Sequence, residues 1–202
     1  MSTVSELVAL HERALRLTTD LVAGIAADQL DNETPCAKWD LRALLTHMTI
    51  QNHGFAEAAL GRGNDLALWE TRELADPVAE YLTASAELSA AFAAPDLAER
   101  ELVLLEMRTD GGFPPELAVR FQIVDCVVHA WDVARAIGAS VSLDDDPELA
   151  AESRRIAEFV PGGEIRLTEN APFGPMLEVP EGAGTLDRIL LLLGRDPQWA
   201  HA

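Results

Sequence analysis

The chain has 202 residues and a formal net charge of -19, from 34 acidic and 15 basic residues. A surface this acidic repels phosphate, so nucleic acids and anionic membranes are not expected partners. Alanine and leucine are abundant and only 5% of the residues are aromatic, which favours helices over a sheet. No apolar stretch reaches the roughly 20 residues needed to span a bilayer.

The first part of the chain has the spacing of apolar residues that is typical of long helices. The pattern predicts four of them, over residues 4–27, 40–60, 77–93 and 116–137. Asp40 is a good N-cap, Pro77 suits a first turn, and Gly138 suits the position after a last turn. Gly54 marks an expected break in the second helix. Residues 102–107 form a short apolar run that is either a strand or an extended linker.

The rest of the chain predicts a smaller unit packed on these helices. Helices are expected over residues 147–159 and 186–193, and two extended segments, residues 164–168 and 176–180, could form a hairpin. Between them, Phe173-Gly174-Pro175 is either a tight turn or a lip over a pocket. The chain is therefore expected to be mainly α, with a four-helix bundle in residues 1–140 and a small α/β C-terminal appendage in residues 141–202.

One pair of polar residues stands out in the fourth predicted helix. Asp125 and His129 are four residues apart, so their side chains lie roughly one above the other on the helix. The surrounding residues are almost all apolar, which indicates a buried helix. A buried carboxylate and a buried imidazole each need a partner. A metal ion would satisfy both, and so would a bond between the two side chains or an arginine from another helix.

A second histidine with the same character lies in the second predicted helix. Leu41 and Leu44 mark the buried face of that helix, and His47 lies on or beside this face. Taken alone, such a histidine also fits a hydrogen-bonded core position. Together, His47, Asp125 and His129 make the ligand set of an open metal site, with positions left for water or substrate.

Two sequence motifs resemble those of a known family. Residues 34–47, TPCAKWDLRALLTH, resemble the TPCxxWDxRxLLxH signature of the DinB-like, mycothiol-dependent maleylpyruvate isomerase-like proteins. Residues 125–138, DCVVHAWDVARAIG, resemble the second motif of that family. Residues 173–175, 186–190 and 194–197 resemble the C-terminal part of an actinobacterial branch of the same family. The resemblance therefore covers nearly the whole chain.

The resemblance implies a fold, a metal site and a chemistry. It implies a DinB-like four-helix bundle that binds a divalent metal through His47, Asp125 and His129, where the characterised isomerase has glutamate in place of Asp125. Zinc is the expected metal, and nickel and iron suit the same donors. The implied enzyme is a thiol-dependent transferase or isomerase, in which the thiol of mycothiol or a relative is deprotonated at the metal and adds to a small-molecule electrophile. The alternative is a non-catalytic metal-binding or stress-response protein of the same fold.

Further candidate residues are the two cysteines, one more aspartate and two arginines. Cys126 is expected in the core, whereas Cys36 is either a packed loop residue or a reactive thiol near a helix N-terminus. Asp132 either orients a ligand imidazole or forms a helix-surface or interhelical salt bridge with an arginine. Arg135 and Arg195 are candidates for recognising an anionic thiol or substrate.

The remaining histidines are expected outside the metal site. His11 is expected to be solvated, His53 points away from His47 around the helix, and His201 lies in the terminal tail. The N-terminus has no basic segment followed by an apolar run, so a cytoplasmic location is expected. A homodimer is left open.

Overall fold

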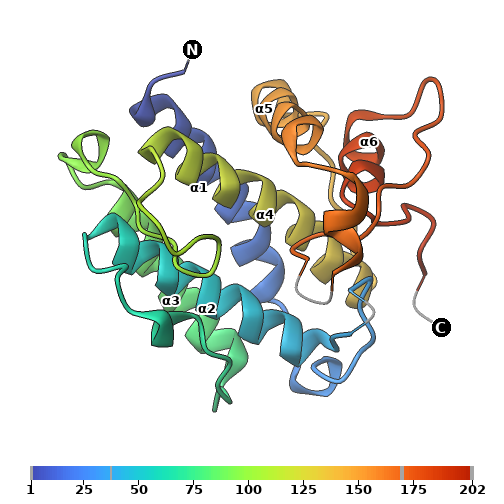
Figure 1. The fold of residues 1–202 in the computed structure, drawn as a ribbon. Coiled ribbons are helices and arrows are strands. Elements are labelled where there is room, and N and C mark those ends of the chain that lie inside the picture. Colours follow the sequence, from blue (N-terminus) through green and yellow to red (C-terminus); the bar gives the residue numbers. More distant parts are fainter. Residues whose placement is uncertain (1, 37, 169–170, 201–202) are drawn as a thin grey trace.

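The computed structural model describes residues 2–36, 38–168 and 171–200, and in this part of the chain the protein is mainly helical (Figure 1). The six α-helices are α1 Val4–Val22, α2 Leu41–Ala59, α3 Pro77–Phe92, α4 Pro115–Ala136, α5 Pro147–Phe159 and α6 Thr185–Leu192. Helix α1 packs along α4, and α2 packs along α3, so these four helices form the predicted bundle. Helices α5 and α6 pack against each other, and α5 also contacts α4.

The helices begin where local hydrogen bonds satisfy their first backbone amides. Thr3 and Glu6 form a capping box at the start of α1, and the Asp40 side chain accepts from the amide of Ala43 at the start of α2. The first helix ends at Val22 rather than near residue 27. It stops there because the next residues form tight turns, followed by the 3-10 helix η1, Ala27–Gln29.

Helix α2 is continuous through Gly54, so the predicted break is wrong. The glycine instead makes room for Trp69, at the end of the 3-10 helix η2, Leu66–Trp69. A Cβ added at Gly54 would lie 2.5 Å from two atoms of the indole ring, far inside van der Waals contact. Gly54 thus lets the segment after the second helix lie directly on α2.

Helix α4 is buried on nearly all sides, as its apolar sequence predicts. It shares one large apolar cluster with α1, α3, α5, α6 and the C-terminal part of α2. Its last turns join a second cluster, which contains the N-terminal part of α2. The polar side chains of α4 therefore lie inside the protein, where their partners decide their chemistry.

The predicted C-terminal hairpin is wrong. The segment expected as its first strand is a 3-10 helix, η4 Gly163–Leu167, and the described residues contain only two isolated β-bridges, Glu33 with Asp40 and Leu102 with Phe113. Instead of strand pairing, the buried guanidinium of Arg166 donates to backbone carbonyls of three separate segments, at Val160 and Pro161, at Gly174 and at Leu192. A side chain, and not strand pairing, thus ties these three segments together.

Two further expectations concern the whole chain. The division into residues 1–140 and 141–202 stays a prediction, although residue 141 does follow the end of α4. In the described ranges, no helix combines the length and the apolarity that crossing a bilayer requires.

Candidate metal centre

Helices α2 and α4 bring the three predicted ligands together. His47 on α2 and Asp125 and His129 on α4 each offer a ligand atom, and these atoms all lie within 4.8 Å of one another. The Nε2 atom of His129 is 3.4 Å from Oδ1 of Asp125, and the rings of His47 and His129 have centroids 5.4 Å apart. Two imidazoles and a carboxylate at this spacing fit one divalent ion with open positions.

Asp132 fixes the orientation of the His129 ring. Its Oδ2 atom is 2.9 Å from Nδ1 of His129, so Nδ1 carries the proton that is donated to the carboxylate. The Nε2 atom then faces Asp125 and His47, and in the neutral ring it carries the lone pair that a metal would bind. Asp132 also pairs with Arg195, so the structure combines the two roles that the sequence left as alternatives.

The two histidines differ in their charge. Burial lowers the pKa of His47 to about 4, and the neighbouring His129 adds to this effect, so His47 is neutral and its lone pair is free. Burial also opposes the charged form of His129, but the carboxylates of Asp125 and Asp132 outweigh it and raise its pKa well above the ordinary value. Burial likewise opposes the charge of Asp125, but the imidazole of His129 holds its pKa below the usual range. The carboxylate is therefore ready to act as a charged ligand.

Cys36 and Arg195, which the sequence offered as candidates without assigning them a contact, both lie against Asp132. The Sγ atom of Cys36 donates to Oδ2 of Asp132 over 3.2 Å. A guanidinium nitrogen of Arg195 lies 3.3 Å from the same oxygen and 3.6 Å from Sγ. Cys36 is thus a loop residue that contacts the site. Arg135, the other arginine candidate, donates to the backbone carbonyl of Trp199 instead.

Local backbone geometry explains how Arg195 reaches the site. Gly194 ends α6 with φ +78, and the amides of Gly194 and Arg195 bond back to the carbonyls of Leu191 and Leu190, which is a Schellman motif. A Cβ on Gly194 would also lie 2.7 Å from the carbonyl carbon of Gly174. Residues 173–175 therefore pack against the end of α6 and do not line the pocket described next.

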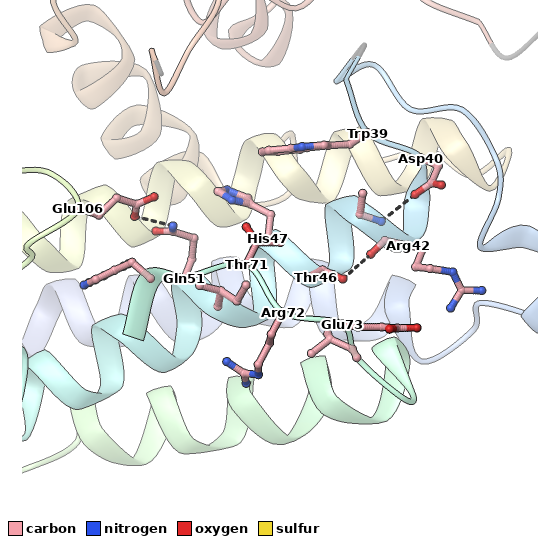
Figure 2. A pocket seen from close by; sticks show the side chains of 14 residues that line it. Trp39, Asp40, Arg42, Thr46, His47, Gln51, Thr71, Arg72, Glu73 and Glu106 are labelled. Carbon is pink, nitrogen blue, oxygen red and sulfur yellow. Dashed lines mark hydrogen bonds between the residues drawn. The ribbon is translucent and has the colours of Figure 1, made fainter. Parts of the chain in front are cut away.

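A pocket of about 410 Å³ opens beside His47, between α2 and the segment that follows η2 (Figure 2). The ring of Trp39 stacks on His47 with centroids 4.5 Å apart, and Gln51 donates to Glu106 over 2.6 Å at the neighbouring edge. Arg72 and Trp69 also line this pocket, and the buried indole nitrogen of Trp69 has no hydrogen-bond partner among the described residues. The guanidinium of Arg72 can therefore donate hydrogen bonds to an acceptor group of a ligand in this pocket.

The remaining candidates lie away from the site. His53 binds Glu87 at 2.9 Å, which agrees with its predicted direction away from His47, and Cys126 is in the core as predicted. The prediction for His11 is wrong, because this residue is fully buried and packs edge-on against Phe92. His201 lies outside the described residues.

The fold and the donor set define a helical-bundle protein with a candidate His/Asp/His metal site, and sequence comparison identifies its family. The model of the mycothiol maleylpyruvate isomerase N-terminal domain matches residues 11–134, and the chain belongs to this family. Two uncharacterized proteins from Mycobacterium tuberculosis, of strains CDC 1551 / Oshkosh and ATCC 25618 / H37Rv, are each 30% identical over 193 residues. Each of these matches covers 92% of this chain and 95% of the relative.

Solved structures show the same fold. The crystal structure of the mycothiol-dependent maleylpyruvate isomerase superimposes with a TM-score of 0.56 at 15% identity, and that of a mutant of this enzyme with a TM-score of 0.54 at 14% identity. Each superposition covers 82% of this chain and 70% of the other. At this level of identity the likeness is evidence of a shared fold alone.

Proposed function

We propose that this protein is a metal-dependent enzyme that uses a low-molecular-weight thiol of the mycothiol type, as an isomerase or an S-transferase. The observation that carries the proposal is the convergence of His47, Asp125 and His129 beside a pocket large enough for a small molecule. The solved structures with the same fold are named as a mycothiol-dependent isomerase, which supports the choice of thiol chemistry.

The three side chains would hold one divalent ion, with zinc as our choice and nickel or iron as other metals that accept the same donors. With the metal in place of the Nε2 proton of His129, two neutral imidazoles and one carboxylate would leave the ion with a net positive charge, which favours a thiolate over a thiol at an open position. Asp132 keeps Nε2 of His129 directed toward Asp125 through the bond at Nδ1. The ring of Trp39 covers one face of His47.

The pocket beside His47 would hold the thiol and the electrophilic substrate. Its aromatic walls, Trp39 and Trp69, suit apolar parts of a ligand, and the guanidinium of Arg72 suits oxygen acceptors. The overall charge of -19 opposes the approach of anions, so recognition has to come from these local donors. Low-molecular-weight thiols are kept reduced in the cytoplasm, where we place the protein.

The proposal is tested by titrating mycothiol into the metal-loaded and the metal-free protein by isothermal calorimetry. Thiol binding is expected only in the metal-loaded form. In the cobalt-substituted protein the thiol should also change the visible absorption of the metal. A His53→Ala variant, changed at a histidine outside the site, should behave like the wild type. Equal binding to both forms, or binding to neither, would contradict the thiol chemistry and favour a non-catalytic metal-binding protein.

A further inference from the structure

His129 stands between two sets of metal-ligating side chains. One set is His47, Asp125 and His129, and the other is Cys36, His129 and Asp132. In each set the ligand atoms all lie within 4.8 Å of one another. Nε2 of the imidazole faces Asp125, and Nδ1 faces Asp132. The protein therefore offers a cation two positions, one at each nitrogen of the same ring.

Ligand chemistry alone does not exclude the second position. Sulfur is a donor that zinc binds well, and a carboxylate and an imidazole complete a common donor set. The carboxylate of Asp132 is fully buried, and its Oδ1 atom has no partner among the described residues. An acceptor of this kind is what a cation on this side would bind.

Arg195 distinguishes the two positions. Its guanidinium contacts two of the three donors of the second set, Oδ2 of Asp132 at 3.3 Å and Sγ of Cys36 at 3.6 Å, and its side chain is only 9% exposed. Arginine keeps its positive charge inside proteins. A divalent ion on this side would therefore meet a fixed like charge at close range in a poorly solvated place.

The backbone at the end of α6 places Arg195 at this contact. Gly194 turns the chain at the end of α6, and the backbone of Arg195 bonds to Leu190. The guanidinium carbon also lies 5.6 Å from the ring centroid of Phe173.

We propose that Arg195 is a positioning residue that fills the Cys36–Asp132 side of His129 with a fixed positive charge and so confines the divalent ion to the His47–Asp125 side. This inference rests on the proposed metal site. In this arrangement Cys36 is not a metal ligand. Removing the charge of Arg195 should open the second donor set, either to a second ion or to a shift of the first one.

The test uses cobalt, because a cobalt–thiolate bond gives a charge-transfer band in the near ultraviolet that nitrogen and oxygen donors do not give. The wild type should bind one equivalent of cobalt without this band. Arg195→Met, which keeps an unbranched stem without the charge, should show the band, and the double variant with Cys36→Ser should lose it. Arg195→Lys, which restores a charge, should suppress the band again.

A second measurement uses the wild type and does not depend on the folding of any variant. Alkylation of Cys36 by iodoacetamide, followed by mass spectrometry, should proceed at the same rate with and without cobalt. The buried Cys126 serves as the internal reference. Protection of Cys36 by cobalt in the wild type, or a thiolate band there, would overturn the inference. A folded Arg195→Met variant without the band would overturn it as well.

The two proposals fail in different ways. If the wild type binds no cobalt, or if His47→Ala leaves cobalt binding unchanged, the His47–Asp125 site itself is wrong and the inference falls with it. If His47→Ala abolishes binding but Arg195→Met gains no thiolate band, the metal site stands and only the role of Arg195 is refuted.

Discussion

Nδ1 of His129 and Oδ2 of Asp132 lie 2.9 Å apart, three residues from each other on α4, and both side chains are buried. This bond decides which nitrogen of the imidazole faces the other ligands. A polar contact made inside one helix thus sets the direction in which the helix presents a ligand to its neighbour α2.

Asp132→Asn should weaken metal binding by roughly 10- to 100-fold, as loss of a residue that orients a ligand typically does. The amide no longer carries the negative charge that holds the proton at Nδ1 of His129. Affinity is measured by competition with a chromogenic chelator. Asp144→Asn, at an exposed position outside the site, is the control and should bind metal like the wild type. Equal affinities for the two variants would argue against the orienting role.

Alanine at His47, Asp125 or His129 should each remove most of the bound metal and leave the helical circular dichroism largely intact. A site with three protein ligands has no spare donor. Metal content is measured on protein purified without chelators, with His53→Ala as the matched control. A variant that keeps about the metal content of the wild type would show that the changed residue is not a ligand.

Metal should raise the melting temperature of the protein. An ion that binds only the folded state adds about 2.7 kcal/mol of stability when it is present at about 100 times its dissociation constant. A chelator should lower the melting temperature without unfolding the protein at room temperature, because the bundle has an extended apolar core of its own. The measurement is thermal unfolding followed by circular dichroism. The same melting curve with and without chelator would be inconsistent with the site.

His11 should make the protein sensitive to acid. Burial lowers the pKa of His11 from 6.5 to about 3, and neither ring nitrogen has a partner among the described residues. Below pH 6.5 the unfolded chain binds a proton at this residue that the folded protein refuses. The free energy of unfolding therefore falls with decreasing pH, by about 1.4 kcal/mol per pH unit from this residue, until the pH approaches the folded pKa.

His11→Leu should remove this part of the acid sensitivity and raise stability at neutral pH by about 1–3 kcal/mol, because it replaces an unpaired buried polar ring. Urea unfolding of both proteins at several pH values between neutrality and mild acid measures the difference. Near neutral pH the free energies of unfolding of the two proteins should differ only by that constant gain. The difference should grow as the pH falls. Parallel curves would mean that His11 accepts a proton in the folded state.

Gly54→Ala should destabilise the protein by about 1–3 kcal/mol, which is typical of overpacking. The new methyl group would lie 2.5 Å from ring atoms of Trp69, so the indole and the pocket wall that it forms have to move. Gly184→Ala is the control, because a Cβ there meets nothing within 4 Å. Urea unfolding compares the two variants. Equal stabilities would mean that Trp69 does not rest on α2.

Local sequence determined much of the fold. The limits of α5 agree with the prediction, and α2, α3, α4 and α6 agree to within about a residue at each end, because caps, prolines and apolar spacing act over one or two turns. The spacing of Asp125 and His129 likewise placed both side chains on one face of α4. The buried position of His11 could have been predicted in the same way, since it continues the stripe of Val4, Leu7 and Ala14.

Only the tertiary structure decided which distant groups meet. Arg195 reaches Asp132 across 63 residues of chain, and Arg166 binds backbone carbonyls of three segments in the region where the sequence predicted a hairpin. The spacing of apolar residues shows which face of an element is buried. It does not show which charged side chain of a distant loop packs against that face. That choice depends on the packing of α6 against Gly174, where two backbones approach closely enough to exclude any side chain at Gly194.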